Sequence, residues 1–145
     1  MTLSTSDIKQ MQKMAVTGFV YLFVSLFCIL FGAVYESFSH GVYSCFMLYA
    51  FVFPLVGGVI PFFGIAFSGM PVPNRVPRNL YHSGIAALTT GSLLEGALEI
   101  YGTTNRLVSV YWILGILFVL AAVFIYCLFQ EKTKYSKMEN DNLDL

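Results

Sequence analysis

The segment from Gly84 to Leu107, GIAALTTGSLLEGALEIYGTTNRL, decides how this chain folds. Its first half is apolar and rich in small residues, and its second half carries two carboxylates, Glu95 and Glu99, four residues apart. A continuous apolar helix suits a lipid environment, in which charged side chains are costly. The short polar sequence GTTNR then leads into a further apolar run. The segment therefore predicts half of a helical hairpin in a membrane, and it raises the question of what the two acids do there.

The composition of the whole chain also indicates a membrane protein. Of its 145 residues, 57% are hydrophobic and 11% are charged, and the mean hydropathy is +0.74. In soluble proteins about a quarter of the residues are charged. The formal net charge is zero, so the chain has no basic surplus with which to bind the phosphates of nucleic acids. We therefore expect the lipid bilayer as a partner and no nucleic acid.

Four apolar runs are close to or above the roughly 20 residues that a helix needs to cross about 30 Å of hydrocarbon. Backbone amides in lipid must be bonded internally, and the hydrophobicity is continuous rather than alternating, which excludes a β-barrel. The short polar joining segments predict two antiparallel hairpins. We predict an all-α membrane protein, a single four-helix domain over residues 1–145, with spans at residues 14–35, 42–67, 80–101 and 107–129.

The placement of Lys and Arg predicts the orientation of these spans. If the N-terminus is cytoplasmic, seven of the eight basic residues lie on that side and only Arg106 lies on the other. Both termini are then cytoplasmic, residues 1–13 form a short N-terminal segment and residues 130–145 form a mobile tail. The first span is too long for a removable signal peptide and lacks its small-residue cleavage site. We expect a multi-pass protein of the bacterial cytoplasmic membrane.

The second span contains four residues that disturb helices, Pro54, Gly57, Gly58 and Pro61. Each proline removes a backbone donor and clashes with the preceding turn, so we expect a kink or break. In one interpretation Pro61 simply ends the span, because proline and glycine are common in membrane helices. In the other, the freed backbone groups bind an ion or a substrate, as in the discontinuous helices of some transporters.

The third span has a ridge of small residues on one side. Ser83, Ala87 and Gly91 are spaced four residues apart, and Glu95 and Glu99 continue the same line. Small residues at this spacing let another helix backbone approach closely, so we expect the ridge and its acids to face protein. Small residues at positions 18, 25 and 32 form a second line in the first span that could meet this ridge.

A polar cluster is predicted at the outer end of the bundle, provided that the first and third spans are neighbours. Its candidate members for an ion or proton site are Glu36, His40, Glu95, Glu99 and Arg106, with Asn105 beside them. Glu95 lies about one turn deeper than Glu99, roughly 9 Å inside the outer boundary, and must be neutralised or paired at that depth. The functional interpretation is a proton- or cation-handling site. The structural interpretation is a set of interface residues that pair with Arg106 and hold the hairpins together.

The remaining reactive residues show no pattern typical of an enzyme. The three cysteines lie in apolar runs without metal-ligand spacing, and a disulfide between Cys28 and Cys45 is a lesser alternative. His40 and His82 are separated by most of the membrane thickness, so one chain cannot hold a haem iron between them. Phosphate-binding loops, zinc helices and serine elbows are missing from the sequence. We therefore expect no metal and no cofactor, and we rank an enzyme third among the function classes.

Two function classes lead. The first is a non-enzymatic structural or accessory membrane component, whose small-residue surfaces bind its own helices, a further copy of the chain or a larger membrane partner. The second is a small oligomeric transporter or channel, coupled to protons or cations through Glu95 and Glu99. The transporter would be oligomeric because four short helices barely enclose a cavity.

Overall fold

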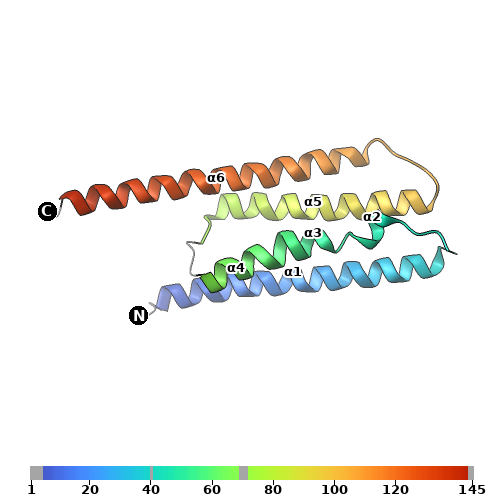
Figure 1. Cartoon of the computed structure of the whole chain (residues 1–145), viewed down its shortest axis with the longest axis horizontal. Coiled ribbons are helices and arrows are strands. Elements are labelled where there is room, and N and C mark those ends of the chain that lie inside the picture. The colour runs from blue at the N-terminus through green and yellow to red at the C-terminus, as the bar shows by residue number, and fades with distance from the viewer. Residues whose placement is uncertain (1–4, 40, 69–71, 144–145) are drawn as a thin grey trace.

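The structure is a computed structural model that describes residues 5–39, 41–68 and 72–143, except for the side chains of 6–7 and 133–143. All regular secondary structure in these residues is helical, which confirms the predicted all-α class (Figure 1). The first and last helices are long. The helical run Cys45–Ser68, here called the second column, is divided into several short elements. The elements are α1 (Thr5–Phe38), α2 (Cys45–Leu48), α3 (Val52–Pro54), the π-helical η1 (Leu55–Val59), α4 (Ile60–Ser68), α5 (Arg75–Ile100) and α6 (Val108–Leu143).

Three of the four helical columns are long and apolar enough to cross a membrane, at residues 8–38, 45–68 and 108–132. Their length and composition are those of a membrane protein. The predicted span at residues 80–101 falls in α5, which is not one of these three. Its acids, hydroxyl groups and glycines make α5 more polar than its neighbours.

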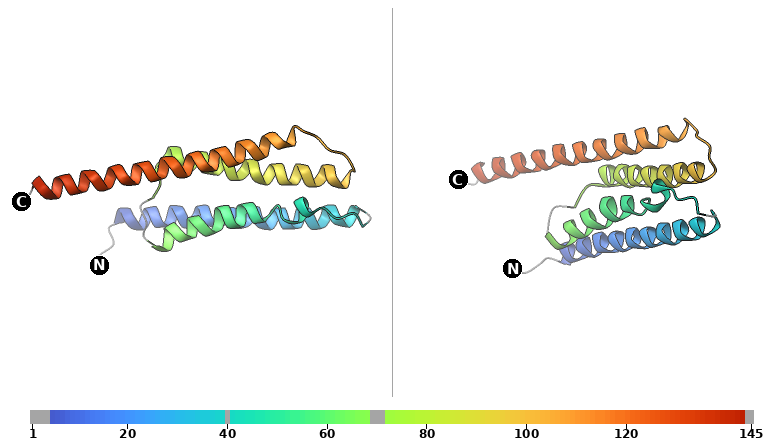
Figure 2. Two further views of the ribbon diagram at one scale, coloured as in Figure 1. Left: turned by 45° about the horizontal axis from the view of Figure 1, so that its top comes forward. Right: turned by 45° about the vertical axis from the view of Figure 1, so that its right-hand side comes forward.

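The helices form two layers, as the left view of Figure 2 shows. One layer contains α1 and the second column, from α2 to α4, and the other contains α5 and α6. The start of α1 and the end of α6 lie at the same end of the bundle, here called the terminal end (Figure 1). The opposite end, called the far end, contains the end of α1, α2 and the end of α5.

The second column is irregular because of its two prolines. The ring of Pro54 would clash with the carbonyl of Ala50, four residues earlier, and the α-helix is interrupted there, between Leu48 and Val52. The next proline, Pro61, has Gly57 at the equivalent position, and Gly57 lies in the π-helical turn η1. A π turn has room for such a distortion. The interruption of the α-helix thus lies about one turn before Pro54 in the sequence, although Pro54 causes it.

The line of small residues on α1 packs against the second column and not against α5. A Cβ added to Gly18 would lie 2.9 Å from the ring of Phe63, and one added to Gly32 would lie 3.4 Å from the backbone oxygen of Met47. In return, Gly58 makes room for the ring of Tyr21 on α1. The prediction that this line meets the ridge of the third span is therefore wrong. The second column, which follows α1 directly in the chain, occupies this face of α1.

The second layer is held by glycines at the crossing of α5 and α6. A Cβ on Gly84 would lie 2.9 Å from the backbone nitrogen of Val119, and one on Gly115 would lie 3.1 Å from the backbone oxygen of Gly84. Such contacts allow two backbones to pack closely in lipid. Most of α6 beyond this crossing is exposed, and it is the least buried of the three apolar helices.

The last helix continues past the end of the predicted span. The sequence predicts a span of residues 107–129, and the apolar part of α6 covers residues 108–132, while the helix continues to Leu143. The stretch QEKTKYSKMEN is rich in Glu, Lys, Gln and Met, which are good helix formers, so the apolar helix extends into it without a break.

Candidate functional site

The predicted outer cluster falls at the far end of the bundle, where α2 meets α5. The Ser44 hydroxyl donates a hydrogen bond to Oε2 of Glu99 at 2.6 Å. The same hydroxyl oxygen accepts from the backbone N–H of Met47 at 3.3 Å, so Ser44 is also the N-cap of α2. Ser44 is buried, and this part of the second column is held to α5 through one charged group.

Two further residues of α5 complete this contact: Gly96 lies about one turn before Glu99 in the helix, and Ser92 lies about two turns before it. The Ser92 hydroxyl donates to the backbone carbonyl of Phe46 at 2.6 Å and is almost fully buried. A Cβ on Gly96 would lie 2.6 Å from the backbone nitrogen of Met47. We call this set of residues the α2–α5 contact; its members are Ser44, Phe46, Met47, Ser92, Gly96 and Glu99. It satisfies a carbonyl of the irregular second column that would otherwise be unpaired in an apolar setting.

The other predicted members of the cluster are not joined to it by ion pairs. Arg106 is exposed, and within the described residues no ion pair links it to Glu36, Glu95 or Glu99. Glu95 is half-buried. Glu36 is half-buried, and its Oε1 atom is shielded from solvent without a hydrogen-bond partner. His40 lies outside the described residues. Asn105 accepts the Leu107 N–H through Oδ1 at 3.0 Å, ahead of α6.

The small-residue ridge is only partly turned toward protein. Gly91 is buried against the Tyr111 side chain, Ala87 is half-buried and Ser83 is exposed. The buried line of α5 instead runs through residues 84, 88, 92 and 96, one position further along the helix. A shift of one residue turns the line by about 100°, and the shift arises because α5 must contact α6 on one side and α2 on the other.

The helix-disturbing residues of the second column serve packing within the chain. Pro54 and Gly58 are buried, and Gly57 faces the side chain of Ile85 on α5. Pro61 lies in the first turn of α4, next to the buried Phe62. The structure thus brings Pro54, Gly57 and Gly58 to the junction of α1, α5 and the second column, whereas Pro61 lines a cavity beside α5 and α6.

A second polar site, in the half of the bundle nearer the terminal end, is not evident from the sequence. The Tyr21 hydroxyl and His82 Nδ1 form a hydrogen bond of 2.6 Å between α1 and α5. The imidazole stacks on Phe62 of α4, with ring centroids 5.0 Å apart and planes inclined by 13°. Sequence spacing gave no signal for this pair, because 61 residues separate them. His82 is half-buried among rings.

An open groove runs between α1 and α5 over this pair. One cavity, of about 470 Å³, is lined mainly by apolar and hydroxyl side chains and reaches Thr90. A second, of about 500 Å³, opens at the terminal end between Lys9, Lys13 and Arg78. Both cavities share Val16, Thr17 and His82 in their walls, so they join end to end. We call the two together the α1–α5 groove.

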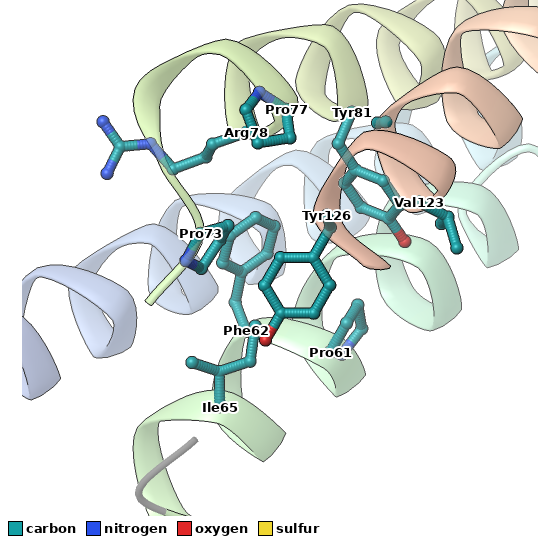
Figure 3. Close-up of a pocket in the computed structure, with 10 residues that line it drawn as sticks. Pro61, Phe62, Ile65, Pro73, Pro77, Arg78, Tyr81, Val123 and Tyr126 are labelled. Carbon is teal, nitrogen blue, oxygen red and sulfur yellow. The ribbon is translucent and has the colours of Figure 1, made fainter. Parts of the chain in front are cut away.

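A third cavity, of about 210 Å³, lies between α4, α5 and α6 (Figure 3). Its walls are rings and aliphatic side chains, chiefly Pro61, Phe62, Tyr81 and Tyr126. The guanidinium of Arg78 points away from these rings in Figure 3. The cavity therefore offers an apolar surface with few polar groups to orient a ligand.

Metal and disulfide chemistry find little support among the described residues. In this part of the chain, no three His, Cys, Asp or Glu side chains are grouped so as to hold a metal ion. All three cysteines are free, so the Cys28–Cys45 alternative is not realised. Comparison with protein-family models, with curated proteins and with solved structures gives no significant match for the chain.

Proposed function

We propose that this chain is a four-pass, non-enzymatic component of the bacterial cytoplasmic membrane, structural or accessory in role, with both termini in the cytoplasm. Three apolar helices support this, and so does the close packing of α5 on α6, the helix of highest hydropathy. Seven of the eight basic residues lie in the parts of α1, α5 and α6 nearest the terminal end (Figure 1). That bias supports a cytoplasmic position for this end.

The α2–α5 contact is the observation that carries the structural role. The Glu99 carboxylate, which the sequence marks as a possible coupling group, is bonded to Ser44 within the chain. Ser92 on the same helix bonds the backbone of the second column. Polar groups that are committed to such bonds stabilise the bundle, since each would be left unsatisfied if the helices separated.

A double-mutant cycle tests this role. Ser44→Ala and Glu99→Gln are each expected to lower the free energy of unfolding by about 1 to 2 kcal/mol, because each weakens a charge-assisted hydrogen bond. The double variant should lose clearly less than the sum of the two. Fully additive losses would show that the pair is not coupled, and a structural role for Glu99 would then fail. Thr104→Ala, on an exposed side chain at the same end, serves as the control.

A small oligomeric transporter is the second candidate, and one observation favours it. The Oε1 atom of Glu36 is shielded from solvent without a hydrogen-bond partner, and an acid in a membrane helix is a candidate for ion transport. Glu95 and Glu99 on α5 are the further candidate acids of this transporter. In reconstituted vesicles, proton or cation flux that is lost in both Glu36→Gln and Glu95→Gln would support transport. Vesicles without flux above the empty-vesicle level would exclude it.

The proposed role also implies partners within the membrane. Lipid contacts the outward faces of α1 and α6, and those faces are equally open to a further copy of the chain or to a larger membrane protein. Light scattering of the purified protein in detergent measures whether the copies associate. A monomer at all concentrations would remove the homo-oligomer from this proposal and leave the other two partners.

A further inference from the structure

We propose that the α1–α5 groove binds one anionic phospholipid, with the phosphate among Lys9, Lys13 and Arg78 and one acyl chain along the apolar part of the groove. The inference is independent of the structural role proposed above. It is also independent of which side of the membrane the terminal end faces, because both leaflets contain phospholipid.

Charge complementarity at the mouth of the groove is the first argument. Lys9 and Lys13 stand one turn apart on α1, and Arg78 faces them from α5. Gln12 and Asn79 complete the wall with uncharged donors. A carboxylate is missing from the described lining of this mouth. Three cations and two amides around one opening match a phosphodiester, which offers several acceptor oxygens.

The change of polarity along the groove is the second argument. Beyond His82 the walls are formed by Val20, Val24, Ile85 and Ala86, with buried Pro54 in the lining as well. A soluble anion would make no favourable contact with this apolar part of the groove. An acyl chain would fill it and remove its apolar surface from the gap between the helices.

The length of the groove is the third argument. From His82 to Thr90 on α5 the apolar part extends eight residues, or about 12 Å at 1.5 Å per residue. One leaflet of hydrocarbon is about 15 Å deep. The groove therefore matches a single acyl chain of one leaflet, with its charged end at the level where headgroups lie.

The Tyr21–His82 pair separates the two parts of the groove and explains why it stays open. α1 and α5 do not pack backbone to backbone; they are linked by this side-chain bond and by the second column. The bond gives the Tyr21 hydroxyl oxygen and His82 Nδ1 a partner within the chain, so these two atoms do not depend on the lipid for a hydrogen bond.

The test compares lipid binding by the purified full-length protein and its charge variants. Native mass spectrometry in detergent measures how much phosphatidylglycerol, phosphatidylcholine or inorganic phosphate the protein retains. We expect tighter binding of phosphatidylglycerol. The double variant Lys13→Gln/Arg78→Gln should bind it about 25-fold more weakly, since each cation near a membrane surface contributes roughly fivefold. Its affinity for phosphatidylcholine should stay unchanged.

The matched charge control is Arg75→Gln/Lys132→Gln, which removes two exposed cations outside the described lining of the groove. It should keep the affinity of the unchanged protein for phosphatidylglycerol. An equal loss in both double variants would show a general effect of surface charge and overturn the proposal. Equal binding of the two lipids by the unchanged protein would also overturn it.

A second pair of variants tests the acyl part. Ala86→Phe fills the groove and should lower the retention of both lipids several-fold, whereas Ser83→Phe, exposed on α5 outside the described lining, should not. Thr90→Phe is the alternative if Ala86→Phe does not fold. Retention of inorganic phosphate as strong as that of phosphatidylglycerol would identify a soluble-anion site, and so would full lipid retention in the filled variants. Either result would refute the lipid assignment.

Discussion

Gly96→Ala should destabilise the bundle far more than a methyl group normally does. The added Cβ would lie 2.6 Å from the backbone nitrogen of Met47 and 2.9 Å from its Cα. Backbone atoms cannot rotate away, so α5 must move away from α2. Overpacking of this kind costs about 1 to 3 kcal/mol.

The same movement lengthens two hydrogen bonds of the α2–α5 contact, from Ser92 to the carbonyl of Phe46 and from Ser44 to Glu99. Each contributes about 1 kcal/mol. Alanine offsets up to about 1 kcal/mol of this loss, because it favours a helix over glycine. We therefore expect Gly96→Ala to lower the free energy of unfolding by about 3 kcal/mol, taking overpacking near the middle of its range.

Reversible unfolding in a titration of dodecyl sulfate against mild detergent measures this change through tryptophan fluorescence. The chain has one tryptophan, Trp112, and its ring lies edge-on to Phe46 and Phe53 at 6.1 and 5.5 Å. Its emission therefore reports the separation of α6 from α2 and α3. The control is Gly64→Ala on α4, where nothing lies within 4 Å of the added Cβ. Unchanged stability of Gly96→Ala, or an equal loss in the control, would refute the reasoning.

Three further predictions concern other parts of the fold. Gly84→Ala should weaken the α5–α6 crossing by about 2 kcal/mol, because its Cβ would meet the backbone of Val119 at 2.9 Å; the same titration measures it. Tyr21→Phe should cost about 1 kcal/mol through loss of the bond to His82; a melting temperature equal to that of the unchanged protein would contradict this. In a cysteine-free background, an impermeant thiol reagent applied to intact cells should label a cysteine at position 104 and not one at position 74; labelling at 74 would reverse the proposed orientation.

Three of the helical columns could be predicted from the sequence, because the length of an apolar run is enough to indicate a helix that can cross a membrane. The runs near α1, the second column and α6 are each long enough to cross hydrocarbon, and all three appear as apolar helices in the structure. Prolines also predicted an irregular second column, yet its interruption lies earlier, at the residue four positions before Pro54. The predicted span of residues 107–129 lies close to the apolar part of α6, residues 108–132, and the helix itself continues to Leu143, because hydropathy marks the apolar part of a helix and not its end.

The candidate site could be predicted only in part, because sequence spacing gives the face of a helix but not its neighbour. The pattern of Ser83, Ala87 and Gly91 correctly indicates that α5 has small residues, but two neighbours compete for that helix, and the buried line is turned by one position. Glu99 was grouped with Arg106 by depth, whereas its bond is to Ser44, 55 residues away. Contacts between distant segments depend on the packing of the whole bundle, so residue spacing in one sequence does not predict them.

The polarity of α5 has a consequence for how the chain is made. α5 emerges from the ribosome before α6, and it is the one column among the described residues that is not apolar enough to be a candidate membrane span. A translocon accepts a segment according to its hydrophobicity, so if α5 crosses the bilayer as proposed, we expect it to be poorly retained there on its own. Its glycine crossing with α6 supplies the missing partner, because α6 is strongly apolar and follows after a short loop. We expect α5 and α6 to enter the membrane together, and a ribosome stalled before α6 should leave α5 open to extraction and proteolysis.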